Sequence, residues 1–262
     1  MDNTNKKNEE VRRLLIMAIL AGRIMLKNGA ETYRVEDTII RLCKSRYNIK
    51  YAESFVTSTG IFVSIEYNGE VISYLKRIKT RTIDLNKIDM VNSFSRSFVE
   101  SNMSVDEGMK ELKKINKTEN YKFHTQIIFG SMAAAFFSLL FGGTFLDFIS
   151  SFLVSIVVVL VADKLGQLDS TFFINNLIGA SIASILAILA VKIGIGTNID
   201  KIIIGSIMTL VPGVAITNAI RDTISGDFLS GLSRGMEAIL TALSIALGAG
   251  VILKIYFRSW LF

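Results

Sequence analysis

The sequence has 262 residues, half of them hydrophobic and a fifth charged, with a formal net charge of +6. This combination excludes both an ordinary soluble domain and a uniform membrane bundle, so the two populations must be segregated along the chain. The basic residues are spread over several elements without an aromatic-interleaved motif, which argues against nucleic acid and leaves anionic membrane lipid as the simpler partner.

The composition changes at about residue 120. Charged residues crowd the stretch up to Lys122, and beyond it single charges and small clusters separate long apolar runs. We therefore predict a cytoplasmic domain over residues 1–120 and a transmembrane domain over residues 121–262. Cys43 is the only cysteine, so no intrachain disulfide can form, which fits a cytosolic location for the first domain.

The first domain is predicted to have an α+β fold. Apolar residues recur at helical spacing over 11–27, Asn28-Gly29 supplies a helix stop, and a second helix follows over 31–46. Three runs rich in β-branched and aromatic residues are separated by turn signals and predict a three-stranded antiparallel meander. These runs cover residues 53–58, 61–67 and 71–78. Two more helices are expected over residues 86–101 and 105–114.

The second domain is predicted to be an α-helical integral membrane bundle of about five transmembrane helices. A spanning helix needs about 20 apolar residues, and five segments come close to that length. The spans are expected near residues 123–141, 145–162, 172–191, 202–220 and 235–253. The second is the weakest of the five, because only the stretch between Asp147 and Asp163 is free of charge.

Basic residues near the first span set the expected orientation. Five lysines precede it, whereas the loop around Gly142 has none, which indicates that the N-terminus lies in the cytoplasm and the C-terminus outside. These lysines are Lys110, Lys113, Lys114, Lys117 and Lys122.

Small residues recur every four positions in three of the spans. The sets are Gly179/Ala183/Ala187, Gly205/Thr209/Gly213/Thr217 and Ala238/Ala242/Ala246/Gly250. Such faces let helices approach closely, either within one chain or between the subunits of a homo-oligomer, and both interpretations stay open.

The only proline, Pro212, falls within the fourth span beside Gly213. Because it lacks a donor and crowds the carbonyl four residues back, it predicts a kink or break near the bilayer centre. Broken helices expose backbone dipoles to substrates and ions in transporters, although a simple kink would leave the same signature.

Polar residues in and beside the spans are the candidate substrate and ion pathway, because such groups must face protein or water. Arg221 or Arg234 would pair with a substrate carboxylate, asparagines would donate hydrogen bonds, and an acidic residue would take up a proton. Structural salt bridges in a loop are the alternative. The full set is Asn175, Asn176, Pro212, Gly213, Asn218, Arg221, Asp222, Asp227, Arg234 and Glu237.

No catalytic, metal or cofactor site is predicted, and we expect that the chain is not an enzyme. The sole histidine, His124, lies at the entrance to the first span, where an interfacial position explains it, and histidine-based catalysis has no other candidate.

Several motifs, in order over nearly the whole chain, resemble the threonine/serine exporter family. They are Asn28-Gly29-Ala30-Glu31-Thr32 with Val35-Glu36, the hairpin of residues 57–63, Pro212-Gly213, residues 218–222, residues 225–227, and Arg234 with Glu237-Ala238.

The resemblance implies a secondary exporter of the inner membrane that moves small amino acids or a dicarboxylate such as succinate. It also implies a short membrane partner of the same family, because the chain looks like the long component of a split pair. A membrane-anchored sensor or enzyme, and a scaffold subunit whose partner alone conducts, are the alternatives. Five spans with a broken helix exceed what an anchor requires.

Overall fold

The computed structural model describes residues 2–119, 121–167 and 171–258, and these fall into two compact units. The first unit comprises Met1–Asn120 and Val214–Gly235, and the second comprises Tyr121–Gly213 and Met236–Phe262. A segment of 22 residues from the predicted transmembrane domain therefore packs with the N-terminal unit. The helix α10 contributes its first turns to one unit and the remainder to the other.

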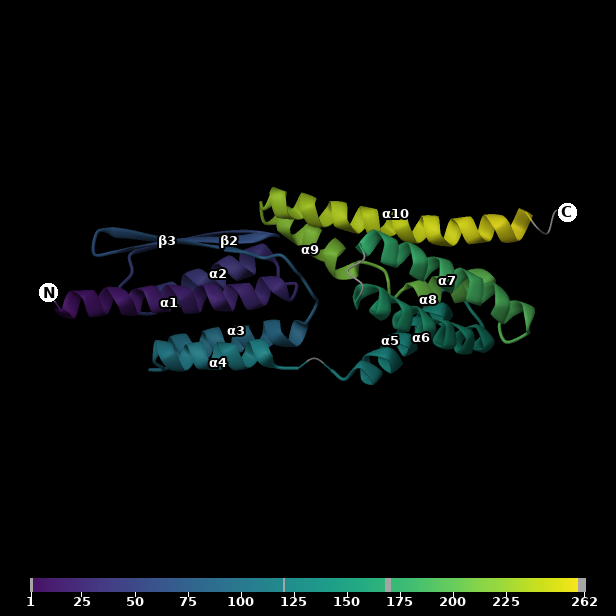
Figure 1. Cartoon of the computed structure of the whole chain (residues 1–262), viewed down its shortest axis with the longest axis horizontal. Coiled ribbons are helices and arrows are strands. Elements are labelled where there is room, and N and C mark those ends of the chain that lie inside the picture. Colours follow the sequence, from purple (N-terminus) through teal and green to yellow (C-terminus); the bar gives the residue numbers. More distant parts are fainter. Residues whose placement is uncertain (1, 120, 168–170, 259–262) are drawn as a thin grey trace. The chain divides into compact units, whose positions relative to one another are not determined.

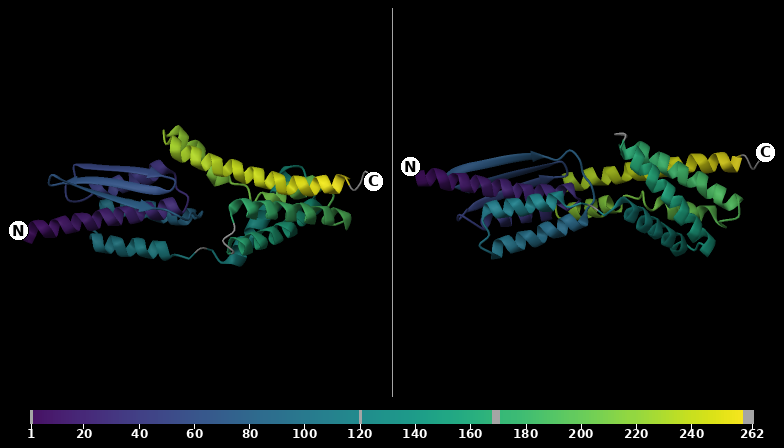
Figure 2. Two further views of the ribbon diagram at one scale, coloured as in Figure 1. Left: turned by 45° about the horizontal axis from the view of Figure 1, so that its top comes forward. Right: turned by 60° about the horizontal axis from the view of Figure 1, so that its bottom comes forward.

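The first unit has three layers (Figure 1). A sheet covers one face of α1 and α2, and α3 and α4 lie against the opposite side of these helices (Figure 2). The side chains of Leu14, Met17 and Met25 on α1 are fully buried, so this helix forms the centre of the core. The helices are α1 (Asp2–Lys27), α2 (Thr32–Lys44), α3 (Leu85–Glu100) and α4 (Val105–Lys117).

The sheet is the predicted antiparallel meander, with strand order β1-β2-β3. Asn68 and Gly69 both have positive φ values, as a two-residue hairpin turn requires. The register pairs Phe55 with Phe62 and Phe62 with Leu75, which places these side chains on the face turned away from α1. The strands are β1 (Tyr51–Thr57), β2 (Gly60–Tyr67) and β3 (Glu70–Arg77).

The single cysteine is a residue of the hydrophobic core. Cys43 lies in the core of the first unit, and its burial raises the pKa of the thiol to about 12. A thiol in this state is a small apolar core group and a poor nucleophile.

The second unit is a helical bundle. Among the described residues, four helices are long and apolar enough to cross a membrane: α5 (Phe123–Leu140), α6 (Phe145–Gln167), α7 (Phe172–Lys192) and α10 (Phe228–Arg258). They correspond to four of the five predicted spans. The short helix α8 packs against α5, α6 and α7.

The remaining predicted span, over residues 202–220, is not among these four helices, because the chain breaks within it. The chain instead forms α8 (Ile199–Ile207) and α9 (Gly213–Ile224), with a break at the predicted position before Gly213. At the break the chain makes a tight turn, in which the Gly213 N–H donates to the Val211 carbonyl at 2.9 Å. The cause is Pro212, which cannot continue the helical ladder.

The second predicted span is longer and more apolar than expected, because α6 runs for 23 residues and has the highest mean hydropathy of the four helices, 2.5.

The predicted small-residue faces of α7 and α10 differ in burial. Ala183 and Ala187 on α7 are fully buried within the chain, whereas on α10 Ala238 is buried and Ala242, Ala246 and Gly250 are exposed. Packing within the chain therefore accounts for the small residues of α7 but not for the exposed ones of α10.

Candidate functional site

The loop between α1 and α2 has a fixed shape. Gly29 adopts a φ of +97°, a conformation that favours glycine, and the Ala30 N–H then donates to the Met25 carbonyl at 3.1 Å. The Asn28 side chain donates to the Ile24 carbonyl at 2.6 Å. This local chemistry ends α1 and holds the residues that begin α2 in one position.

Asp222 on α9 is the centre of a buried polar network in the first unit. Its side chain has no exposed surface and accepts hydrogen bonds from the Thr32 backbone N–H at 3.0 Å and from the Thr32 hydroxyl at 2.9 Å. Arg234 on α10 approaches the other carboxylate oxygen at 3.1 Å and donates to the Ala30 carbonyl at 2.8 Å. The paired guanidinium offsets the cost of burying this carboxylate.

Asp227 joins the same network from the turn between α9 and α10. Gly226 has a φ of +91°, and the Asp227 backbone N–H donates to the Asp222 carbonyl at 2.8 Å. The Thr32 hydroxyl lies 2.8 Å from the Asp227 carboxylate. One hydroxyl therefore contacts two acidic side chains.

A second ion pair flanks the network. Glu31 pairs with Arg221 of α9 and with Arg34, whose guanidinium lies 3.1 Å away, and Asn218 donates to the Gly29 carbonyl at 2.8 Å. Burial raises the pKa of Glu31, but the hydrogen bonds from its backbone and Arg221, with the two nearby arginine charges, outweigh it. The net effect is a pKa below the ordinary value.

Glu36 lies one helical turn after Thr32 on α2, on the same side of the helix. Its carboxylate accepts a hydrogen bond from the Val56 N–H at 2.7 Å. Burial, followed by repulsion from Asp227 and Asp222, raises its pKa despite that hydrogen bond. The network therefore contains a carboxyl group that favours its protonated form more than an exposed glutamate would.

The structure separates the ten predicted pathway residues into two groups. The first unit holds Asn218, Arg221, Asp222, Asp227 and Arg234, and the contacts above bring these together. The second unit holds Asn175, Asn176, Pro212, Gly213 and Glu237.

Within the second unit, the asparagines lie near the helix break. Asn175 and Asn176 are half-buried on α7, one turn before Gly179, and a β-carbon added at Gly179 would lie 3.0 Å from Leu210. The helix α7 thus packs closely against the segment that interrupts the fourth span. Glu237 is half-buried on α10.

Asp147 forms a separate polar cluster in the second unit, which the sequence analysis treated only as a boundary of a span. This buried carboxylate accepts six hydrogen bonds, at 2.7–2.9 Å, from the backbone N–H and side chain of each of Thr144, Thr197 and Asn198. It joins the α5–α6 loop to the α7–α8 loop.

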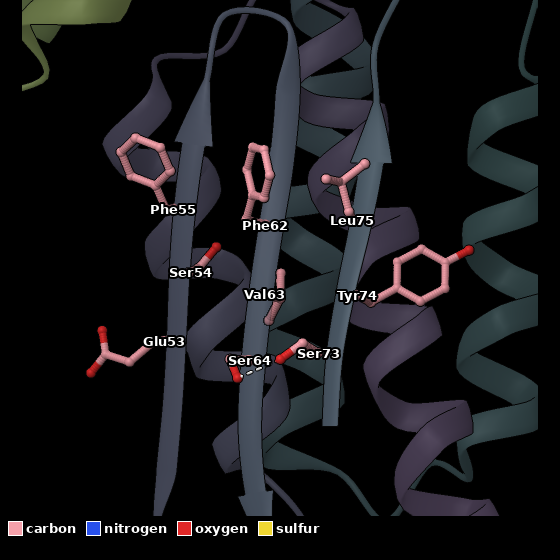
Figure 3. A pocket seen from close by; sticks show the side chains of 9 residues that line it. All are labelled: Glu53, Ser54, Phe55, Phe62, Val63, Ser64, Ser73, Tyr74 and Leu75. Carbon is pink, nitrogen blue, oxygen red and sulfur yellow. Dashed lines mark hydrogen bonds between the residues drawn. The ribbon is translucent and has the colours of Figure 1, made fainter. Parts of the chain in front are cut away.

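The exposed face of the sheet carries an open hollow of about 570 Å³ (Figure 3). Phe55, Phe62 and Leu75 form a row across the three strands, and the hydroxyls of Ser64 and Ser73 lie 2.8 Å apart beside it. Glu53, Ser64 and Ser73 form a second, polar row beside the apolar one.

Sequence reasoning missed Thr32, Glu36 and Asp147 as network residues. The first two belong to motifs that carry the family resemblance, and that was their only signal. Among the described residues, no group of three or more histidine, cysteine or acidic side chains could hold a metal ion.

Comparison with known sequences agrees with the motif pattern. The profile of the family described as "Putative threonine/serine exporter" matches residues 16–256. The chain belongs to the threonine/serine exporter family. With four long apolar helices, this membership makes it a multi-pass membrane protein.

Three relatives illustrate the range of the family. The chain is 22% identical over 248 residues to a "Probable threonine/serine exporter" of Mycobacterium tuberculosis, covering 93% of this chain and 46% of that protein. It is 21% identical over 252 residues to a "Threonine/serine exporter" of Corynebacterium glutamicum, covering 93% and 51%. It is 23% identical over 257 residues to the "Probable succinate transporter subunit YjjP" of Escherichia coli, covering 97% and 99%.

The chain therefore spans about half the length of the first two relatives and almost the whole of the third. These relatives are named as exporters or transporter subunits, and none is named as an enzyme. No solved structure matches the chain significantly.

Proposed function

We propose that this chain is one subunit of a secondary transporter of the inner membrane, which exports threonine and serine or a small dicarboxylate together with a short membrane partner. The family match over residues 16–256 is the observation that carries the proposal. The Escherichia coli relative, which aligns over nearly its full length, is named a subunit and so supports a partner.

The bundle supports five membrane crossings, of which the fourth is broken. Asp147 ties the loop before α6 to the loop before α8, so both loops lie at the same end of the second unit. The helix α8 therefore starts at the end where α5 and α7 finish and leads the chain back across the bundle. The lysines before α5 support a cytoplasmic location for the N-terminal unit in this proposal.

The two groups of predicted pathway residues have different proposed roles. Arg221 and Arg234 already have carboxylate partners, so a substrate carboxylate would have to displace Glu31 or Asp222 to bind them. We therefore assign the substrate pathway to Asn175, Asn176 and Glu237 with the Pro212–Gly213 break, where interrupted backbone can bind polar groups. The buried network of the first unit is assigned to coupling.

Efflux from loaded cells tests the function. Cells lacking both native subunits are loaded with threonine- or serine-containing dipeptides or with succinate, and efflux is followed with this chain alone, with the partner alone and with both. The proposal expects efflux of one substrate class only with both chains. Efflux with the partner alone would make this chain a scaffold, and absence of efflux with both proteins present in the membrane would refute the exporter.

A matched pair of variants on α7 tests the pathway. Asn176→Leu should lower efflux at least tenfold at equal membrane levels, because it removes a polar group beside the helix break. Leu189→Ala, at an exposed position of the same helix, should leave efflux unchanged. Equal efflux from both variants would remove the asparagines from the pathway.

A further inference from the structure

Four buried serines of the second unit leave their hydroxyls unpaired. Their side chains are almost completely buried, and their oxygens have no hydrogen-bond partner among the residues that the structure describes. A buried polar group without a partner costs free energy, so each such group in a native fold needs an explanation. The four are Ser131 on α5, Ser150 and Ser155 on α6, and Ser206 on α8.

Other buried serines show what an ordinary packing serine does in this bundle. Ser138 on α5, Ser184 on α7 and Ser244 on α10 each donate to a carbonyl of their own helix, at 2.7–2.9 Å. Such serines fill the volume of a small residue and satisfy their hydroxyl locally. The four unpaired serines do not, although an alanine in their place would pack without the polar cost. Close packing alone therefore leaves their hydroxyls unexplained.

Two of the four, Ser131 and Ser155, lie at one level of the bundle. The short loop of residues 141–144 joins α5 to α6, and these two helices pack against each other as a hairpin (Figure 1). Ser131 precedes the loop and Ser155 follows it at nearly the same distance along the chain, so the antiparallel helices place both at one depth. At a rise of 1.5 Å per residue, this level lies about 15 Å from the loop, near the middle of a hydrocarbon core of about 30 Å.

Ser206 on α8 reaches the same level. The Ser151 hydroxyl of α6 lies 3.5 Å from the Ile202 carbonyl of α8, and both helices start from the loops that Asp147 joins. Ser155 lies one turn beyond Ser151, and Ser206 lies one turn beyond Ile202. Three helices that pack together therefore each bring one unpaired hydroxyl to the middle of the bundle.

The surroundings of these hydroxyls favour a positive group over a negative one. The helix α8 ends at Ile207, one residue after Ser206, and the C-terminal end of a helix carries a partial negative charge. No lysine or arginine occurs in residues 125–140, 148–162 or 202–220, so no side chain of these stretches could neutralise a carboxylate. Hydroxyl oxygens and the carbonyls of an interrupted helix accept hydrogen bonds from an ammonium group and coordinate small cations.

We propose that Ser131, Ser155 and Ser206 form a binding site for a small cationic group in the middle of the second unit. Two ligands carry this chemistry, the ammonium group of an amino acid such as threonine and a free sodium ion. The site lies at the last turn of α8 before the helix break, so it continues the pathway assigned to Asn175 and Asn176. Its use in transport rests on the proposed function, whereas cation binding does not.

Substitution by alanine distinguishes a binding site from a packing contact. Ser155→Ala removes an unpaired buried hydroxyl, so without ligand the variant should be at least as stable as the wild type. With ligand it should bind the cation less tightly. Ser184→Ala on α7 removes a buried hydroxyl that already has a partner, and it should leave the affinity for the cation unchanged.

Thermal unfolding of the full-length chain in detergent, alone and with the partner subunit, measures the binding. The melting temperature is followed during titration with threonine, with sodium chloride against choline chloride, and with choline succinate. The proposal expects stabilisation by threonine or by sodium and none by succinate, which has no cationic group. The affinity should fall about tenfold in Ser155→Ala and in Ser206→Ala, the effect of losing one hydrogen bond to a charged group.

The arms of this titration identify the ligand. A serine-dependent response to threonine would assign the site to the ammonium group of the substrate, and a response to sodium alone would assign it to a coupling ion. The site would be overturned by the absence of both responses, by a response that Ser155→Ala and Ser206→Ala retain, by an equal loss in Ser184→Ala, or by a serine-dependent response to succinate.

Efflux measurements separate this site from the proposed function. With both subunits present, efflux at low substrate concentration should fall about tenfold in Ser155→Ala, in step with its affinity, and stay unchanged in Ser184→Ala. Equal efflux from these two variants would remove the serines from the transport pathway and leave the exporter intact. A serine-dependent response in a chain without efflux would refute the exporter and leave the cation site intact.

Discussion

Each unit buries an aspartate completely, and the two are stabilised in different ways. Asp147 in the second unit is surrounded by six neutral donors from two loops. Asp222 in the first unit combines hydrogen bonds from Thr32 with the charge of Arg234 and shares the Thr32 hydroxyl with a further carboxylate.

The difference separates a carboxylate held by neutral donors from one that also has an ion pair. Around Asp147 the donors are backbone N–H groups, two hydroxyls and one amide, so this carboxylate depends on hydrogen bonds without a charged partner. Around Asp222 the guanidinium of Arg234 supplies a compensating positive charge at 3.1 Å. Two buried carboxylates of one chain thus depend on different interactions, which substitutions can separate.

The largest effect is expected for Asp222→Ala, which leaves the Arg234 guanidinium buried without its partner. Breaking a buried ion pair in this way costs about 3–5 kcal/mol of the free energy of unfolding. Chemical denaturation of the detergent-solubilised chain measures the loss. The double variant Asp222→Ala/Arg234→Met should recover a large part of it, and a double variant no more stable than the single one would show that the charge is not the cause.

A smaller loss is expected for Asp147→Asn, which replaces two acceptor oxygens by one acceptor and one donor that faces other donors. Hydrogen bonds to charged groups contribute about 1.5–3 kcal/mol, so the loops of residues 141–144 and 193–198 should open. Hydrogen exchange of these loops measures the effect. Asp163→Asn at an exposed position of the same helix is the control, and equal exchange in both variants would contradict the role of Asp147.

Local patterns in the sequence were sufficient for most secondary structure. The apolar period of α1, the Asn28-Gly29 stop and the Asn68-Gly69 turn act over a few residues, and the structure confirms each of them. The break before Gly213 was also predicted, because the restriction that Pro212 imposes is local.

The two polar networks could not be derived from local patterns. Thr32 and Asp222 are 190 residues apart, and the loops joined by Asp147 are about 50 residues apart. Hydropathy counts a buried aspartate only as a charge that shortens a span, which is why α6 was underestimated. Partners in tertiary structure decide whether such a residue ends a helix or stabilises it.

Close packing of α8 gives a further test within the second unit. A β-carbon at Gly205 would lie 2.8 Å from the Ala134 carbonyl of α5, so Gly205→Ala should push the helices apart and cost about 1–3 kcal/mol. Thermal unfolding in detergent measures this cost. Gly130→Ala on α5 meets no atom within 4 Å and should be neutral or slightly stabilising. A loss of similar size in both variants would show that helix packing at Gly205 is not the reason.

The smallest effect is expected for Glu36→Gln, and it should depend on pH. Burial and the nearby aspartates raise the pKa of Glu36 above its ordinary value of 4.5. The stability that its protonated form contributes is therefore complete below the ordinary value and lost as the pH rises through the raised one. The substituted glutamine has no proton to lose, so this variant should gain at most about 1 kcal/mol relative to the wild type at neutral pH, since partial exposure screens the charge. Unfolding curves recorded from pH 4 to pH 8 measure the gain, and a difference that stays constant over this range, or that grows towards acid, would show that Glu36 does not respond to the charge of the network.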